Sequence, residues 1–179
     1  MEINIKLNSD VIDLLNAYPE RVAIATRRSI NRAIYGINTD SARIIREKYN
    51  IKKRNINIGI KKLKATGKSL NGKVEIGGKP ISLKEFNPRP AKIGVRRPKE
   101  GITVSIRKGE RTLYKGSFLD RRGNIFVRKG KERLPIKKLY GPRLYQMIDD
   151  NSRVGIRNMA KERLLKTFTH EMEKGGAYK

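Results

Sequence analysis

The sequence predicts an α+β fold in which long N-terminal and C-terminal helices pack on a mostly antiparallel, basic β-sheet. One observation is that helical periodicity occupies both ends of the 179-residue chain, whereas short apolar runs split by Gly, Pro and Asn occupy the middle. The other is charge. The chain has 43 Lys and Arg against 17 Asp and Glu, and residues 51–143 hold 28 of the former and six of the latter. A basic, strand-rich middle therefore lies between helical ends of nearly balanced charge.

The N-terminal part, residues 1–50, is predicted to be mostly helical. Residues 2–7 alternate in hydropathy like a short strand, and Ser9 is a suitable N-cap for a short helix that ends near Leu15. Pro19 suits the first turn of a second helix that runs to about Tyr49. That helix either stays continuous or breaks near residues 36–38, Gly-Ile-Asn. Its apolar stripe consists of Ile30, Ala33, Ile34, Ile37, Ile44 and Ile45.

The middle part, residues 51–140, is predicted to be rich in strands and contains a proline-rich arm. Strand-like runs separated by turn residues lie at 58–65, 72–77, 102–106, 111–119 and 124–129. Residues 77–101 contain four prolines and are predicted to form a long loop or arm that reaches a neighbouring copy.

The C-terminal part, residues 141–179, is predicted to be helical and to complete a single domain over 1–179. It follows the junction RLPIKKLYGPRLYQMI at 133–148, where Pro135 is expected to end strand pairing and Tyr140-Gly141 to form a turn. Gly141 and Pro142 are expected to start a short helix to about Asp149. Ser152 is expected to cap a last helix that ends at Gly175. Its stripe against the first long helix consists of Ile156, Ala160, Leu164, Phe168 and Met172.

Few residue patterns favour catalysis. The chain contains no cysteine, and Gly67-Lys68-Ser69 lacks the earlier glycine and the following helix of a phosphate-binding loop. The only histidine, His170, is expected on the surface of the last helix, and the acidic residues of the middle part have no spacing typical of a metal site. We therefore expect no enzyme, no cofactor and no metal. No run of 18 apolar residues occurs, so we expect no membrane partner.

The net charge of +26 favours a polyanionic partner, which is DNA, RNA or an acidic protein surface. Exposed rings do not form an evident series along the strands, so we expect contact with backbone phosphates rather than base stacking. The candidate contacts are Lys61, Lys62, Lys64, Arg96, Arg97, Arg107, Lys108, Arg121, Arg122, Arg128, Lys129 and Lys131.

Six segments together resemble the minor tail protein Z family of tailed bacteriophages and prophages. They are YNIKKRNI at 49–56, GITVSIRKG at 101–109, YKGSFL at 114–119, GNIFVRKG at 123–130, LPIKKLYGP at 134–142 and the Gln146-Met147 helix. The resemblance covers roughly residues 20–175, and the run from Pro135 to Pro142 is its most specific part.

The resemblance implies a virion protein that completes the tail at its head-proximal end and is needed for head–tail joining. It implies assembly in the host cytoplasm, and no catalytic residues or cofactor. The expected partners are further copies of the chain in a hexameric ring, the tail tube or tail terminator protein, and the head connector. The tape measure protein and the genomic DNA end are further candidates. The alternatives are an RNA- or DNA-binding basic module without activity, and a nuclease. Neighbouring tail and connector genes would distinguish a tail protein from both.

Overall fold

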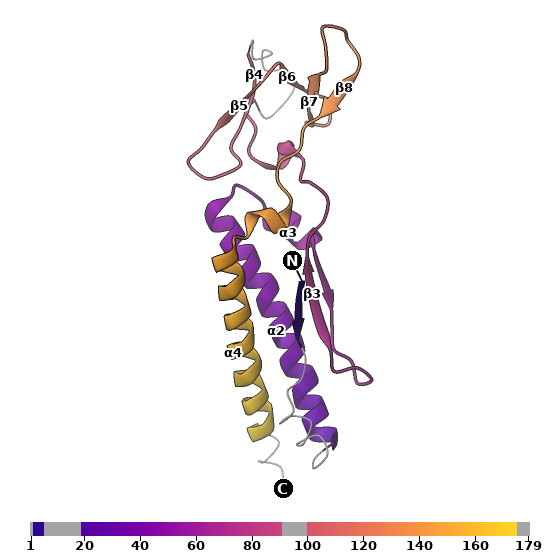
Figure 1. The fold of residues 1–179 in the computed structure, drawn as a ribbon, viewed down its shortest axis with the longest axis vertical. Coiled ribbons are helices and arrows are strands. Elements are labelled where there is room, and N and C mark those ends of the chain that lie inside the picture. The colour runs from indigo at the N-terminus through magenta and orange to yellow at the C-terminus, as the bar shows by residue number, and fades with distance from the viewer. Residues whose placement is uncertain (1, 6–18, 91–99, 175–179) are drawn as a thin grey trace. The chain divides into compact units, whose positions relative to one another are not determined.

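The computed structural model describes residues 2–5, 19–90 and 100–174, and it confirms the α+β class (Figure 1). The chain divides into two compact units. Unit 1 comprises Met1–Ala42, Ile60–Gly77 and Ile148–Lys179, and unit 2 comprises Arg43–Gly59 and Gly78–Met147. That these units fold as one domain stays a prediction. The expected short helix at Ser9–Leu15 and the expected end of the last helix at Gly175 lie outside the described residues.

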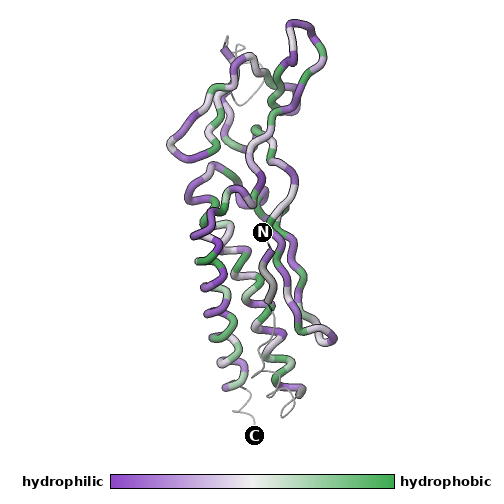
Figure 2. The backbone as a smooth tube through the Cα atoms, viewed as in Figure 1, coloured by the Kyte–Doolittle hydropathy of each residue, from purple (hydrophilic) through white to green (hydrophobic). Residues whose placement is uncertain are grey.

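Helix α2 (Pro19–Lys48) provides the apolar face on which unit 1 is built. Apolar and polar residues alternate along it, as Figure 2 shows, and the helix is continuous through residues 36–38, so the possible break there does not occur. Of the predicted stripe only Ile44 is not fully buried; the buried members are Ile30, Ala33, Ile34, Ile37 and Ile45.

Helix α4 (Asp150–Lys174) runs antiparallel to α2 within unit 1. Ion pairs join Arg28 to Glu171 at 2.6 Å and Asp40 to Arg163 at 2.9 Å. Of the predicted stripe of α4, Ile156 and Ala160 are buried, whereas Leu164, Phe168 and Met172 remain partly exposed. The helix is therefore held to α2 by ion pairs as well as by apolar contact.

The sequence predicts Ser152 as the N-cap of α4, but the structure has Asp149 in that position. The Asp149 Oδ1 atom accepts a hydrogen bond from the backbone N–H of Ser152 at 2.8 Å. An aspartate three residues before the donor satisfies one of the free N–H groups of the first helical turn. Ser152 therefore lies within the first turn, and the helix begins three residues earlier than predicted.

Gly36 has a packing role in α2. A Cβ atom at this position would lie 1.8 Å from a terminal nitrogen of Arg163, whose guanidinium passes the glycine to reach Asp40. The Asp40 side chain is only 10% exposed, so its charge needs a partner close by. The glycine thus makes room for an ion pair between the helices.

A three-stranded antiparallel sheet completes unit 1. Its order is β1 (Glu2–Ile5), β3 (Gly72–Ile76) and β2 (Ile60–Leu63), with Ile60 opposite Ile76. Alternate residues Gly72, Val74 and Ile76 of β3 are buried. A Cβ atom at Gly72 would lie 2.4 Å from Cγ2 of Ile30 in α2, so the backbone of β3 approaches the helix closely there.

Unit 2 contains two further antiparallel sheets. The prediction of one sheet formed by the middle of the chain is therefore wrong. Helix α3 (Lys53–Ile58) was not predicted, because no element was assigned to residues 51–57 from the sequence. One sheet pairs β4 (Gly101–Val104) with β5 (Thr112–Lys115). The other has the order β6 (Ser117–Leu119), β7 (Ile125–Arg128) and β8 (Ile136–Lys138).

The predicted strand 111–119 is divided at Gly116. This residue has a φ of +68°, a conformation that glycine adopts without strain, and it separates β5 from β6. Its backbone N–H donates to the carbonyl of Glu100, and Ser117 Oγ accepts from the N–H of Ile102 at 2.9 Å. Because the chain turns at this glycine, the two halves of the predicted strand pair in different sheets: β5 with β4, and β6 with β7.

The segment 77–101 is not wholly an arm. It contains the 3₁₀ turn η1 (Leu83–Glu85), and Leu83 and Phe86 are fully buried in unit 2. Arg89 forms a bridge to Thr103. The two apolar side chains anchor the first half of the segment, and residues 91–99 lie outside the described part of the chain.

The junction at 133–148 is a structural element, but not in the predicted way. The Pro135 carbonyl accepts from Lys129 N–H at 3.1 Å, and β8 begins at the next residue, so the proline starts strand pairing instead of ending it. Proline lacks only a donor, which the first position of an edge strand does not need. Gly141 N–H donates to the Ile81 carbonyl at 2.7 Å, and Tyr140 forms a bridge to Ser82.

Gly141 and Pro142 do not start a helix. A Cβ atom at Gly141 would lie 2.7 Å from the buried ring of Phe86, so this glycine lets the chain pass over that ring. The helical turn is the 3₁₀ helix η2 (Leu144–Met147), which begins two residues after Pro142. Gln146 Oε1 accepts from the backbone N–H of Arg143 at 2.8 Å and so caps it.

We predict that Gly72→Ala destabilises the protein by about 1–3 kcal/mol. The added methyl would overlap Cγ2 of Ile30 and Cδ1 of Ile34, and Cγ2 sits directly on a branched Cβ and cannot swing away. Urea unfolding would measure the loss. Gly77→Ala is the matched control, because open space surrounds that position. Equal stability of the two variants would contradict the close approach of β3 to α2.

A second prediction concerns Asp40 and Arg163. A double-mutant cycle with Asp40→Ala and Arg163→Ala should give a coupling free energy of about 1 kcal/mol, since the carboxylate is largely buried but the guanidinium is a third exposed. In a Gly36→Ala background the coupling should disappear. The exposed Arg43–Glu47 pair, at 4.0 Å, is the control and should give less than about 0.5 kcal/mol. A coupling that survives Gly36→Ala would show that the glycine is not needed for the ion pair.

Candidate nucleic-acid interface

The turn between β6 and β7 holds Arg121 and Arg122 in a fixed backbone. Asp120 Oδ1 accepts from the backbone N–H groups of Arg122 at 2.8 Å and Asn124 at 2.7 Å, and Asp120 Oδ2 accepts from the Asn124 amide at 2.8 Å. Burial alone raises the pKa of Asp120, but these hydrogen bonds outweigh it and hold the pKa below its usual value. The acid therefore fixes the turn, and both arginine side chains are exposed.

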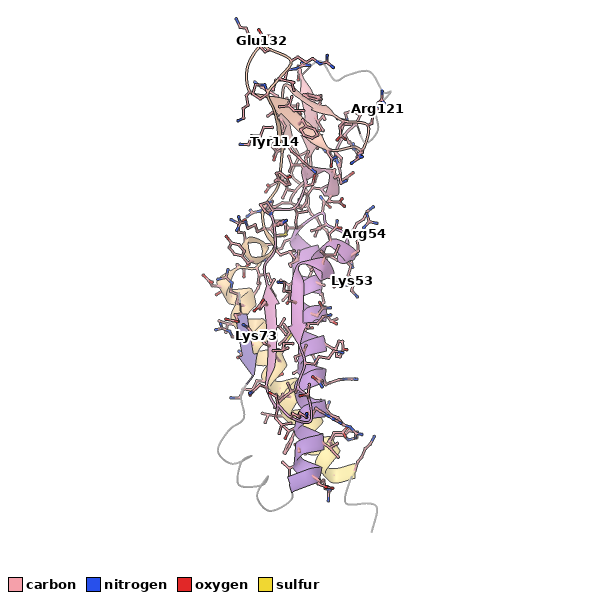
Figure 3. All side chains as sticks on the ribbon, turned by 90° about the vertical axis from the view of Figure 1, so that its right-hand side faces the viewer. Lys53, Arg54, Lys73, Tyr114, Arg121 and Glu132 are labelled. Carbon is pink, nitrogen blue, oxygen red and sulfur yellow. The ribbon has the colours of Figure 1, made fainter. Side chains whose placement is uncertain are left out.

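At the other end of the same sheet, the end of β7 and the following turn carry a second group of cations. Arg128, Lys129 and Lys131 are all exposed, and Arg128 places its guanidinium carbon 5.3 Å from the ring centroid of Phe118. Figure 3 shows Arg121 and Glu132, which mark the two turns of the sheet, at separate places. The candidates of this sheet therefore form two clusters at opposite ends of β7.

Arg107 and Lys108 form a third group in unit 2. Both side chains are exposed, and the Arg107 guanidinium carbon lies 5.9 Å from the ring centroid of Tyr49. Their backbone is tied to the end of α2 and the residue after it, because Lys108 N–H donates to the Lys48 carbonyl at 2.9 Å and Tyr49 forms a bridge to Arg107. Arg96 and Arg97 lie outside the described residues.

The remaining candidates lie in unit 1. Lys61, Lys62 and Lys64 are exposed on or just after the edge strand β2. The ammonium groups of Lys62 and Lys64 lie 5.7 and 4.8 Å from the ring centroid of Tyr35 on α2. A hydrogen bond from Lys64 and the charges of both lysines lower the pKa of Tyr35. Two of the predicted cations therefore form cation–π contacts with this half-exposed ring.

A groove of about 1130 Å³ lies between α2 and α4 in unit 1. Four Lys and Arg residues and two glutamates are among its lining residues, and Glu171 is paired with Arg28, which lowers the pKa of that carboxyl. The exposed His170 is among its lining residues, so its predicted surface position is correct. The main lining residues are Arg28, Arg32, Tyr35, Arg163, Lys166 and His170.

The described residues hold no group of three or more His, Asp or Glu side chains that could bind a metal ion. Over the same residues, no helix has the length and hydropathy needed to cross a membrane.

Sequence reasoning missed several side chains that lie among the candidates. Phe118 and Phe126 stack with ring centroids 6.2 Å apart, and Lys138 lies 5.5 Å from the ring centroid of Tyr140. Alternation along each strand was visible in the sequence. The pairing of residues 118 and 126 was not, because it depends on the register of β6 with β7.

Comparison with known proteins identifies a family. No curated protein and no solved structure matches the chain significantly. The model of the prophage minor tail protein Z family matches residues 6–175, nearly the whole chain. The match includes helices α2, α3 and α4, all three sheets apart from β1, and every candidate cation, and it agrees with the segments that carry the resemblance in the sequence. The chain therefore belongs to the prophage minor tail protein Z family, a family of structural phage tail proteins.

Proposed function

We propose that this protein completes the phage tail at its head-proximal end, that it is needed for head–tail joining, and that its exposed cations contact the DNA end that enters there. Membership of the minor tail protein Z family is the observation that carries the proposal. In this role the protein is not an enzyme and needs no cofactor. It works in the virion after assembly in the host cytoplasm.

The exposed cations are suited to phosphate contact. All ten described candidates are exposed, and several stand on backbone that hydrogen bonds hold in place, such as the turn fixed by Asp120. Each phosphate that a cation neutralises releases condensed counterions, which favours binding at low salt. Among the described helices, α2 and α4 use one face for packing within unit 1 and show no helix–turn–helix arrangement typical of groove-reading proteins. We therefore expect the protein to bind DNA without a preference for base sequence.

The protein is proposed to act as a homo-oligomeric ring. Closed rings are a common arrangement of identical subunits, and six copies would match the symmetry expected of a tail tube. The ring would contact the tail tube or tail terminator protein on one side and the head connector on the other, with the tape measure protein as a further neighbour. Edge strands β2 and β8 offer unpaired backbone groups for contacts between copies.

We predict that the affinity for duplex DNA falls steeply with salt. The logarithm of the binding constant should decrease with the logarithm of salt concentration, with a slope of about −0.9 per phosphate contact. Replacing both arginines of the β6–β7 turn, Arg121→Glu with Arg122→Glu, should weaken binding and reduce the slope by about 2. Fluorescence anisotropy from about 50 to 300 mM salt would measure both quantities.

The matched control is Arg157→Glu with Lys161→Glu. These exposed residues of α4 are not candidate contacts, and their replacement changes the net charge by the same amount. The control should keep the wild-type slope. An unchanged slope in the turn variant would count against Arg121 and Arg122, and an affinity insensitive to salt would count against phosphate contact altogether.

We also predict that purified protein restores function to tails that lack it. Tails assembled without the protein should give few infectious particles when mixed with filled heads, and added protein should raise that number at least tenfold. Analytical centrifugation of the tails should show that several copies bind each one. Full infectivity without the protein would refute the proposed role in joining, and a single bound copy per tail would refute the ring.

A further inference from the structure

One face of the sheet β6–β7–β8 combines aromatic rings with cations. Residues that alternate along a strand point to the same side of a sheet. The register places Phe118 opposite Phe126, Phe126 opposite Lys138, and Arg128 opposite Ile136. These five residues, Phe118, Phe126, Arg128, Ile136 and Lys138, therefore share one side, which we call the ring face.

The geometry within the ring face is that of a stacked platform. The rings of Phe118 and Phe126 lie 6.2 Å apart between centroids, with an angle of 26° between their planes. Neither ring is buried, and Arg128 lies over Phe118 at 5.3 Å. Lys138 extends the arrangement to Tyr140, whose ring is 52% exposed. The two phenylalanines are partly exposed, and the exposed Ile136 and Tyr140 add apolar surface beside the cations.

The charge around the ring face selects an anionic ligand. Residues 117–140 contain eight Lys and Arg but only Asp120 and Glu132 as acids. The Asp120 carboxylate accepts the hydrogen bonds of the turn that it caps, and its charge also interacts with Lys138. Glu132 lies in the β7–β8 turn, outside the ring face. The five residues of the ring face include no acid. A polymer that carries regular negative charge and flat apolar groups fits this surface.

Unpaired nucleic acid has that chemistry. Its bases expose their faces, which stack on aromatic rings and on arginine guanidinium planes, while its phosphates pair with neighbouring cations. In a duplex the base faces are hidden, so duplex DNA can use the cations but not the rings. The ring face therefore has a use that phosphate contact alone does not explain.

We propose that the ring face binds an unpaired nucleic-acid strand, with Phe118 and Phe126 as the stacking platform and Arg128 and Lys138 as phosphate partners. The proposal goes beyond the duplex contact described above and does not depend on it. Since stacking accepts any base, the binding is largely independent of base sequence.

The test compares unpaired and paired ligands on the full-length protein in its assembled state. Anisotropy would be measured with labelled twenty-nucleotide oligo-dT, the corresponding oligo-rU, and a duplex of equal length. Phe118→Leu and Phe126→Leu keep an apolar side chain but remove a ring. Each should weaken binding of the single strands about tenfold and leave duplex affinity within about twofold. The two oligonucleotides distinguish a preference for DNA from one for RNA.

Two further variants keep the outcome clear if a ring variant folds poorly. Ile136→Tyr adds a ring at an exposed position of the same face and should strengthen single-strand binding several-fold. Tyr35→Leu is the control, because it removes an exposed ring next to two lysines in unit 1 and should have no effect. The proposal is overturned by equal losses for single strands and duplex, by an effect of Tyr35→Leu as large as that of Phe118→Leu, or by equally tight binding of poly-glutamate. Failure of duplex binding alone would count only against the proposed function.

Discussion

The apolar face of α2 is the constraint on which most of unit 1 depends. Three isoleucines of this helix in unit 1, Ile30, Ile34 and Ile37, are almost completely inaccessible to water, and each contributes about 1.5–3 kcal/mol when buried. Two glycines let other elements approach the helix: Gly72 brings the backbone of β3 against Ile30, and Gly36 admits the arginine of α4. The helix therefore specifies where its neighbours lie by shape as well as by hydropathy. A side chain at either glycine would push one of them away.

The sequence predicts the helical ends well because their signals are long. A stripe repeated over many turns identifies α2 and α4, although the cap of α4 was assigned three residues too late. Short elements were harder to predict from the sequence. The six residues of α3 are too few to show a period, and the helix is held by contacts from distant residues, such as the Asn55 amide that donates to Glu85 at 2.6 Å. The division of the strands into three sheets depends on Gly116 and on pairing partners, which no local pattern contains.

The candidate site shows the same difference between local and long-range information. That the candidate cations are exposed follows from their chemistry, and the structure agrees for each one that it describes. Their grouping does not follow from the sequence, because it depends on which turns lie at which end of a sheet. Arg121 and Arg128 are close in sequence but lie at opposite ends of β7. Phe118 and Phe126 are just as close, and yet the hairpin brings their rings into contact. Hairpin register thus decides which residues can act together on one ligand.

The interleaved connectivity of the two units has a consequence for how such a gene can vary. The chain passes between the units four times, after Ala42, Gly59, Gly77 and Met147. No single cut therefore separates one complete unit from the other, and a fragment that ends anywhere in the middle lacks strands or helices of both. A genetic crossover between residues 43 and 147 joins segments of two parents in both units, and a crossover elsewhere in the gene does so in unit 1, so the parents need compatible cores. Exchange between related phages should therefore favour crossovers at the gene's boundaries, so that the protein is inherited as a whole.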